Sequence, residues 1–362
     1  MSDSVSESTA GEQEMITAEQ FHQTFHDVRE EIGRVVVGQD RVIEHLLVAV
    51  FSGGHVLLSG MPGLGRTLIV KTAAEVLGLA YRRLQFTPDL LPTDIIGAEI
   101  LESHVATGER NFRFFKGPVF ANMVLADEIN RSPTRTQAAL LEVMQEKQVS
   151  VGGTTYFLPR PYILVATQNT LDTDGIWTLG EAQTDRFMMS IEQEYPEEAE
   201  ERRILVETTG TYKSTARRVT TPERVLAMQR LAREVPVVPS VRGYALSMVR
   251  ASRPGTEESV GAADENIRLG ASPRASQALL MGGKVTALAR GRTHVTRDDI
   301  VSVARPVMAH RLLMDFRAQA EGSQYHEVLD ALVHRAHEKT LPDLSKWTRD
   351  LLKSREREVK DV

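Results

Sequence analysis

The stretch of sequence that decides the fold of this chain is Gly60-Met61-Pro62-Gly63-Leu64-Gly65-Arg66-Thr67. A phosphate-binding loop consists of a glycine, four variable residues and then Gly-Lys-Ser/Thr. The chain meets every requirement of this pattern except the lysine, which is replaced by Arg66. The loop therefore indicates a bound nucleotide, and the arginine raises the question of whether that nucleotide is hydrolysed.

The residues on either side of this loop fit a nucleotide-binding fold. His55–Ser59 is a short apolar run, which predicts a buried strand, and residues 68–77 have helical spacing. A strand, a glycine-rich turn and a helix N-terminus form an anion site, because backbone N–H groups and the helix dipole converge on the phosphates. The hydroxyl of Thr67 is expected to bind Mg²⁺. The residues predicted to bind the nucleotide here are Gly60, Pro62, Gly63, Leu64, Gly65, Arg66, Thr67 and Leu68.

Arg66 keeps the positive charge of the missing lysine but changes its shape. Arginine is a bulky planar fork, whereas lysine is a compact ammonium on a flexible stem. The guanidinium can still pair with β- or γ-phosphate oxygens, but we do not expect it to reproduce the placement of the lysine. Lys71 is no substitute, because it lies roughly 7–8 Å along the helix axis and about 140° around it.

Composition and charge narrow the class of protein. The chain has 362 residues, of which 41% are hydrophobic and 25% charged, and this is ordinary for a globular protein of two or three domains. It contains no cysteine, which excludes a thiolate metal site and a cysteine nucleophile. The sequence has neither a signal-peptide pattern nor an apolar run long enough for a membrane helix, so we expect a cytoplasmic protein without direct membrane insertion. A net charge of −6 argues against nucleic acid as a partner.

Apolar runs alternate with helical stretches from about residue 20 to residue 195, which predicts an α/β fold with a parallel sheet covered on both faces. After Tyr195-Pro196 the strand signals stop. We therefore expect a disordered acidic tail over residues 1–18, an αβα nucleotide-binding domain over 19–196, a helical domain over 197–320 and a helical extension over 321–362. The predicted strands are His55–Ser59, Arg83–Phe86, Met123–Asp127, Tyr162–Thr167 and Phe187–Ile191.

Two of the predicted strands lead directly into polar side chains. Asp127 and Glu128 follow one apolar run, and Asn169 follows another. Asp127 is expected to bind Mg²⁺ directly or through water, and Glu128 to orient and polarise the attacking water. Asn169 can hydrogen-bond the γ-phosphate or that water. Taken alone, the acids could be solvated and Asn169 a turn residue, but their position downstream of a phosphate loop favours a catalytic site.

The chain resembles the MoxR-type AAA+ ATPases over roughly residues 37–312. The most specific matches are Leu125-Ala126-Asp127-Glu128-Ile129-Asn130-Arg131 and Gln85-Phe86-Thr87-Pro88-Asp89-Leu90-Leu91-Pro92. The resemblance implies an AAA+ domain with a parallel five-stranded sheet, followed by a C-terminal all-α lid domain. The other matching segments are residues 53–58, 166–169, 181–187 and 270–274.

The resemblance also implies roles for individual residues. The segment Val37-Gly38-Gln39 would border the adenine, and Asn169 would be sensor 1. Arg186 would be the arginine finger that reaches the neighbouring subunit's nucleotide, and Arg274 would be sensor 2, acting on its own or a neighbouring subunit. Such cations make physical sense, because phosphoryl transfer develops charge beyond what the metal neutralises. The alternative for each arginine is a surface salt bridge.

Two insertions also match those of the family. One covers Ala98–Phe115, and the other covers Gln148–Pro161 and has the pattern of a β-hairpin around Gly152-Gly153. In ATPases of this type such elements face the pore of the ring or a partner. Three aromatic residues of the first insertion either grip a substrate or pack inside the protein: Phe112, Phe114 and Phe115.

The chain also departs from the family pattern beyond Arg66. The family commonly has Asn-Pro where this chain has Asn169-Thr170, and Tyr-Pro-Leu-Pro where it has Trp177-Thr178-Leu179-Gly180. These departures cluster around the nucleotide and the subunit contact. Because both acids, sensor 1 and the finger are retained, the pattern argues against an inactive site.

These features predict an ATPase that uses ATP and Mg²⁺ and forms a homo-hexameric ring with ATP at the subunit interfaces. Its work would be chaperone-like remodelling or maturation of a protein client, with hydrolysis slowed by Arg66. The resemblance implies a client with a von Willebrand A domain. One alternative is an ATP-binding assembly switch with negligible hydrolysis. Another is a nucleic-acid motor, which the pI of about 6.0 disfavours.

Overall fold

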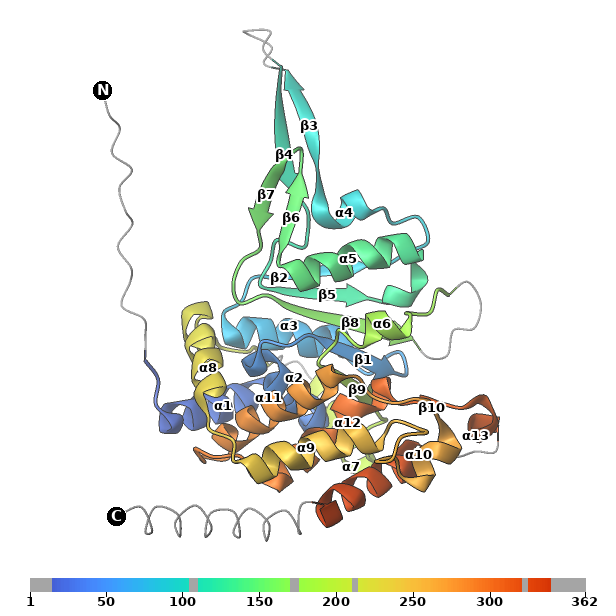
Figure 1. Ribbon diagram of the computed structural model, residues 1–362. Coiled ribbons are helices and arrows are strands. Elements are labelled where there is room, and N and C mark those ends of the chain that lie inside the picture. Colours follow the sequence, from blue (N-terminus) through green and yellow to red (C-terminus); the bar gives the residue numbers. More distant parts are fainter. Residues whose placement is uncertain (1–14, 104–109, 170–175, 210–213, 321–324, 340–362) are drawn as a thin grey trace, which may run out of the picture.

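The computed structural model describes residues 15–103, 110–169, 176–209, 214–320 and 325–339. At its centre lies a five-stranded parallel sheet with the strand order β2-β5-β8-β1-β9 (Figure 1). The predicted parallel five-stranded sheet is therefore confirmed. Its strands are β1 (Val56–Gly60), β2 (Tyr81–Gln85), β5 (Met123–Asp127), β8 (Ile163–Asn169) and β9 (Met189–Gln193).

Successive residues of the central strands pack on opposite faces of the sheet, as the pleat requires. In β5, Met123 and Leu125 belong to one hydrophobic core, and Val124 and Ala126 belong to the other. The first core also holds the helices α1, α2 and α3, and the second holds α4 and α5. The helices of this domain are α1 (Ala18–Gly33), α2 (Asp40–Ser52), α3 (Arg66–Leu77), α4 (Pro92–Ile96), α5 (Thr134–Glu146) and α6 (Glu181–Thr184), with a 3₁₀ turn η1 (Ile129–Arg131).

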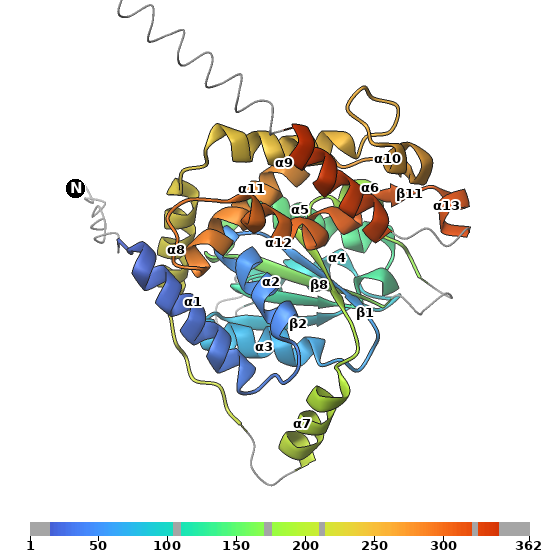
Figure 2. The same cartoon turned by 90° about the horizontal axis from the view of Figure 1, so that it is seen from below.

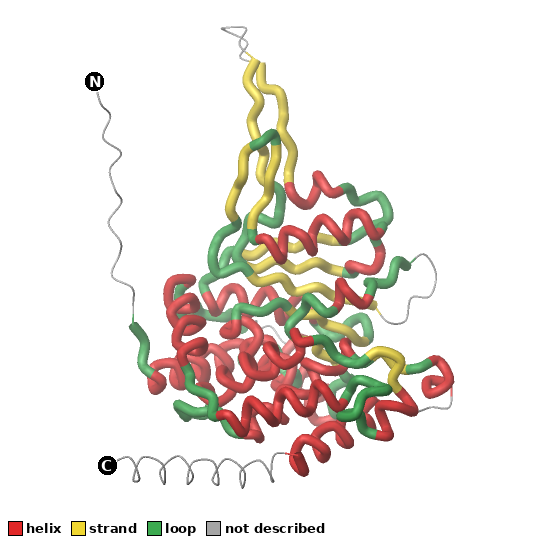
Figure 3. The backbone as a smooth tube through the Cα atoms, viewed as in Figure 1, coloured by secondary structure: helices red, strands yellow, loops and turns green. Residues whose placement is uncertain are grey.

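Two β-hairpins project together from the sheet domain, away from the helical domain (Figures 1 and 3). One consists of β3 (Gly97–Ser103) and β4 (Arg110–Lys116), and the other of β6 (Gln148–Val151) and β7 (Thr154–Phe157). The hairpin predicted within residues 148–161 is confirmed. The first insertion, for which no secondary structure was predicted, is a hairpin as well.

The second domain is a helical lid, as predicted, with one short antiparallel strand pair added. Residues 253–267, for which no individual helix or strand was predicted, include the short helix α10 (Gly261–Asn266). In Figure 2 the lid helices lie in front of the sheet, and α7 (Glu198–Thr209) stands apart from them. The lid elements are α8 (Pro222–Glu234), α9 (Pro239–Ala251), α10 (Gly261–Asn266), β10 (Ile267–Leu269), α11 (Pro273–Ala289), α12 (Arg297–Met308), the 3₁₀ turn η2 (Ala309–Arg311), β11 (Leu313–Met314) and α13 (Phe316–Ala320).

The predicted tail and extension are described only in part. Residues 1–14 lie outside the described residues, and α1 begins at Ala18 with a capping box from Thr17. Of the extension, residues 325–339 are helical, and they bury Leu332 and Ala336 in the core. Within the described ranges, no helix is long and apolar enough to cross a bilayer.

Candidate functional site

The carboxyl ends of the parallel strands meet at one edge of the sheet, where open α/β sheets bind their ligands. Gly60, which opens the phosphate loop, is in register with Asn169 of β8 on one side and with Gln193 of β9 on the other. Asp127 ends β5, and β5 pairs with β8. The structure thus brings together the loop, Asp127, Glu128 and Asn169 at this edge.

The phosphate loop is open and leads directly into a helix. Gly65 adopts a left-handed φ of 73° at the N-cap of α3, a conformation that favours glycine. A Cβ added at Gly63 or Gly65 would meet nothing within 4 Å, so the backbone can approach a ligand closely there. Thr67 lies half-buried in the first turn of α3, and Leu68 is exposed. Backbone amides and the positive end of the helix dipole are therefore available to an anion.

Arg66 does not extend freely toward this loop but is held by three hydrogen bonds. Its guanidinium donates to the Gln193 side chain at 3.0 Å, to the Gln168 carbonyl at 2.9 Å and to the Met61 carbonyl at 2.9 Å. Burial lowers its pKa from the usual value, while the charges of Asp127 and Glu128 act in the opposite direction. In this position the positive charge of Arg66 lies beside the phosphate loop, where it offsets the negative charges of Asp127 and Glu128.

Asp127 is engaged through both carboxylate oxygens. The Thr167 hydroxyl donates to Oδ1 at 2.6 Å, and Arg83 donates to Oδ2 at 2.7 and 2.9 Å. Arg83 comes from the neighbouring strand β2 and is half-exposed. Asp127 is therefore held by side chains from the strands on both sides of it.

The side chain of Glu128 is oriented by its backbone conformation and by two side chains that contact its carboxylate. Its φ of 58° is left-handed, which is uncommon for a residue with a side chain and indicates a constrained turn. Its N–H donates to the Thr167 hydroxyl at 2.8 Å. The carboxylate accepts from Gln85 at 2.8 Å and lies 3.4 Å from Arg131. Glu128 is therefore positioned beside Asp127 by the adjoining strands.

The oxygen ligands present fit Mg²⁺. Asp127 and the Thr67 hydroxyl supply the hard oxygen atoms that Mg²⁺ prefers, and Mg²⁺ takes its remaining ligands from phosphates and water. No cluster of three or more His, Cys, Asp or Glu side chains suited to a metal occurs in the described residues. Mg²⁺ would have to compete with Arg83 for Oδ2 of Asp127.

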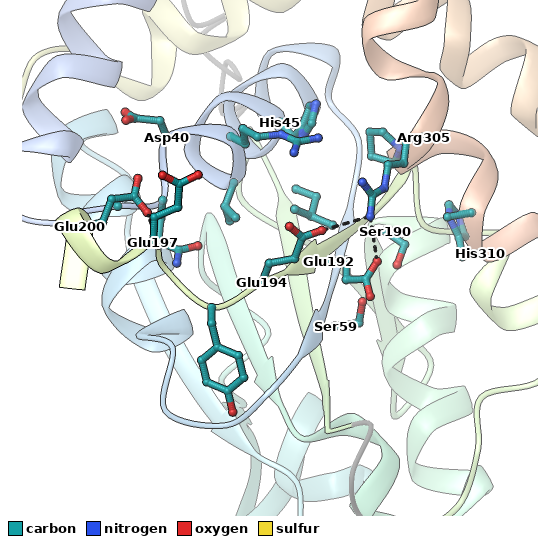
Figure 4. A pocket seen from close by; sticks show the side chains of 18 of the residues that line it. Asp40, His45, Ser59, Ser190, Glu192, Glu194, Glu197, Glu200, Arg305 and His310 are labelled. Carbon is teal, nitrogen blue, oxygen red and sulfur yellow. Dashed lines mark hydrogen bonds and ion pairs between the residues drawn. The ribbon is translucent and has the colours of Figure 1, made fainter. Parts of the chain in front are cut away.

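A cavity of about 440 Å³ lies between the sheet domain and the lid, next to the residues predicted to border adenine (Figure 4). Gly38 and Gln39 line it on one side, and Arg305 of α12 lines it on the other, between Glu192 and Glu194. Val37 is buried just before this segment. The cavity has a size suited to a nucleoside.

Gln193 connects this cavity with the phosphate loop. Its amide group donates to the Gln39 side chain at 3.3 Å and to the Leu64 carbonyl at 3.2 Å. Its oxygen accepts from Arg66. The predicted adenine border and the predicted phosphate loop are therefore joined through one side chain.

Arg186 and Arg274 lie away from this edge. Arg186 precedes β9, so it lies at the amino end of a strand whose carboxyl end reaches the phosphate loop. A five-residue strand spans roughly 13–17 Å, which is longer than an arginine side chain. Arg274, at the start of α11, lies 3.7 Å from Asp185, which directly precedes Arg186. The two arginines therefore belong to the same region of the molecule. The structure does not bring either arginine to this chain's own loop.

Several residues of the site were not singled out from the sequence. Three of them, Gln85, Thr167 and Gln193, are polar residues at or next to the carboxyl end of a strand, and that position was a usable signal. The contact of Arg83 with Asp127 can be recognised only from the strand order, which places β2 beside β5. The fifth, Arg311, lies in the lid and contacts Asp185 at 2.8 Å, and no sequence pattern pointed to it.

Comparison with known proteins agrees with this geometry. A model of the ATPase family associated with various cellular activities (AAA) matches residues 55–189, and a model of the AAA lid domain matches residues 261–335. The chain is 41% identical over 291 residues to Chaperone MoxR1 of Mycobacterium tuberculosis, covering 80% of this chain and 76% of that protein. It is 32% identical over 302 residues to Protein MoxR of Methylorubrum extorquens, covering 79% and 86%. The crystal structure of a candidate ATPase from Cytophaga hutchinsonii superposes with a TM-score of 0.81 at 37% identity, covering 88% of this chain and 96% of that one.

Proposed function

The chain belongs to the MoxR-type family of AAA+ ATPases, and from this premise we propose that it hydrolyses ATP to remodel or mature a protein client. The observation that carries the proposal is the meeting of four elements at one sheet edge: the phosphate loop, Asp127, Glu128 and Asn169. This is the set that phosphoryl transfer to water needs, since that reaction depends on positioning and charge stabilisation.

Each residue has a distinct part in the proposed reaction. The loop amides and the N-terminus of α3 hold the phosphates, and Asp127 with Thr67 would hold Mg²⁺, which neutralises phosphate charge when bound. Glu128 orients a water and accepts its proton as the water attacks the γ-phosphate. Asn169, in register with the first glycine of the loop, fixes the γ-phosphate or that water.

The proposal includes a ring, because one chain holds only part of the machinery at each edge. Arg186 and Arg274 lie near the amino end of β9, where this chain's own phosphates are out of reach. Placed against the carboxyl edge of a second copy, both arginines would meet that copy's γ-phosphate. A closed homo-hexamer is the proposed assembly, with a von Willebrand A domain protein as the client and the cytoplasm as the location.

A second candidate function is an ATP-binding switch that assembles but barely hydrolyses. It is favoured by the three hydrogen bonds of Arg66, which hold the guanidinium on Gln193 and on two carbonyls. A cation held there contributes charge but is not free to follow the γ-phosphate through the reaction.

Phosphate release by the purified protein, measured beside Glu128→Gln and Asp127→Asn variants, tests the proposal. We expect slow Mg²⁺-dependent turnover in the parent protein, ATP that is bound but not cleaved in Glu128→Gln, and weakened Mg²⁺-dependent binding in Asp127→Asn. Binding without turnover in the parent would favour the switch. Equal turnover in the parent and in Glu128→Gln would contradict the assignment of Glu128.

A further inference from the structure

Arg311 of the lid holds the backbone on both sides of Arg186. This guanidinium is almost fully buried, with 2% of its side chain exposed. All five of its N–H groups are used. They donate to the Asp185 carboxylate at 2.8 Å and to the carbonyls of Asp185, Phe187, Met188 and Val307 at 3.0, 2.6, 3.1 and 2.6 Å.

The N–H groups of residues 185–188 already donate to the carbonyls of Glu181, Gln183, Thr184 and His55, so Arg311 supplies the bonds on the carbonyl side of this segment. Residues 185–188 lie between α6 and β9 and belong to neither a helix nor a strand. Within the described residues, the Arg186 side chain makes one hydrogen bond, a long one of 3.5 Å to the Leu141 carbonyl. The direction in which Arg186 points therefore depends on the backbone that Arg311 fixes.

A neighbouring histidine strengthens the same contact. His310 precedes Arg311 in η2, and its Nε2 lies 3.1 Å from the Phe187 carbonyl. Burial lowers the pKa of His310 to about 3, so the ring is neutral at pH 7 and can donate to that carbonyl through Nε2–H. Two consecutive lid residues thus bind residues 185–188, which we call the finger segment because they contain Arg186.

The carboxylate of Asp185 links this support to Arg274. It accepts from the Ser272 hydroxyl at 2.8 and 2.9 Å and lies 3.7 Å from the Arg274 guanidinium. Ser272 is also the N-cap of α11, where it accepts from the N–H of Arg274. One carboxylate therefore joins the buried Arg311 to the helix turn that carries Arg274.

We propose that Arg311 is a positioning residue for ATP hydrolysis in the neighbouring subunit, setting Arg186 and Arg274 as one unit. This rests on the proposed ring ATPase. A lid anchor alone would not need a guanidinium, because burying a charge is costly and an apolar side chain of similar volume packs as well. A planar fork with five donors is needed to hold four carbonyls and a carboxylate in fixed directions.

The test compares Arg311→Lys with Arg292→Lys. Lysine keeps the charge beside Asp185 but cannot span the carbonyls. Arg292 is a matched control, because it donates to the buried Asp299 at 2.7 and 2.5 Å within the lid, and in the described residues its hydrogen bonds go to Asp299 and Thr296 and not to residues 185–188. We expect Arg311→Lys to lower kcat at least tenfold with ATP affinity within twofold of the parent, and Arg292→Lys to change kcat less than twofold. Similar kcat values for the two folded variants would overturn the inference.

Mixing separates a positioning role from a general loss of stability. An Arg311→Lys subunit keeps its own loop and acids, and a Glu128→Gln subunit keeps its finger segment. In co-assembled rings, turnover should return above the sum of the two separate variants. A co-assembled mixture that stays at that sum would show that Arg311 does not act on the neighbour.

A readout independent of hydrolysis keeps the inference distinct from the proposed activity. Assembly driven by a non-hydrolysable ATP analogue, followed by sedimentation, should weaken at least fivefold in Arg311→Lys but not in Arg292→Lys. If the parent shows no turnover and this difference is still found, hydrolysis fails as the function, but Arg311 still positions Arg186 and Arg274 for the nucleotide contact between subunits. If analogue-driven assembly is equal in both variants, the role of Arg311 is refuted.

Discussion

At the scale of single residues, the site differs most from the expected pattern at Arg66. Its guanidinium is held by two carbonyls and Gln193, so its positive charge lies beside the phosphate loop and is fixed there. Transition-state stabilisation depends on cations placed where charge develops, and moving one such group costs a large factor in rate. The hydrogen bonds of Arg66 therefore bear on catalysis more than on nucleotide binding, which the loop amides support.

The first prediction concerns this residue. Arg66→Lys should raise kcat by roughly tenfold, equivalent to about 1.4 kcal/mol of transition-state stabilisation, because an ammonium can follow the γ-phosphate. ATP affinity should change little. Phosphate release under saturating ATP and Mg²⁺ measures the effect, and a thermal melt checks folding. Unchanged or lower turnover in a folded Arg66→Lys protein would mean that Arg66 is not the limiting feature.

The second prediction concerns Arg83. Because Arg83 occupies Oδ2 of Asp127, Arg83→Gln should lower the Mg²⁺ concentration for half-maximal turnover by about two- to fivefold, the range for a half-exposed pair worth up to about 1 kcal/mol. Arg82→Gln is the control, since successive residues of a strand face opposite sides. A higher Mg²⁺ requirement in Arg83→Gln would show instead that Arg83 holds Asp127 ready for the metal.

At the scale of elements, the sequence predicted every strand of the main sheet but misplaced the ends of four of them. Apolar runs report burial, whereas a strand ladder is made by backbone groups and continues through polar residues. The ladders therefore extend to Gly60, Asn169 and Gln193, beyond the predicted ends. Contacts such as Arg83 with Asp127 were not predictable, because they depend on strand order and register. Arg311 was not predictable, because lid and finger segment are 126 residues apart in the chain.

The third prediction separates the aromatic residues of the β3–β4 hairpin, which the sequence left as either gripping or packing. Phe114 stacks on Tyr156 with ring centroids 4.4 Å apart and meets Phe120 edge-on at 5.8 Å, so it packs the two hairpins together. Phe112 is 73% exposed. Phe114→Ala should lower the free energy of unfolding by about 2 kcal/mol, whereas Phe112→Ala should change it by less than about 0.5 kcal/mol.

Urea unfolding measures both variants of the hairpin. If Phe112 contacts a client, Phe112→Ala should impair client remodelling while leaving stability and basal ATP turnover unchanged. A loss of stability in Phe112→Ala equal to that in Phe114→Ala would assign both residues to packing.

At the scale of the whole molecule, the two ends of β9 carry different halves of the proposed reaction centre. The carboxyl end adjoins the phosphate loop through Gln193, and the amino end follows directly on Arg186. A chain built in this way has a phosphate-binding loop at one edge, and Arg186 and Arg274 at the other. Its activity should therefore depend on the contact between copies.

The last prediction follows from this division. Arg186→Ala should lower turnover at least a hundredfold, about 2.7 kcal/mol, within the range for losing one preorganised charge in phosphoryl transfer. It should spare ATP affinity, which rests on the loop amides.

In the parent protein, turnover per subunit should rise with protein concentration through the range where sedimentation shows assembly. Mixing Arg186→Ala with Glu128→Gln then rebuilds interfaces that pair an intact finger with intact acids, so activity should partly return. Turnover per subunit that is independent of concentration, together with no recovery in co-assembled mixtures, would mean that each chain hydrolyses ATP without its neighbour's arginine.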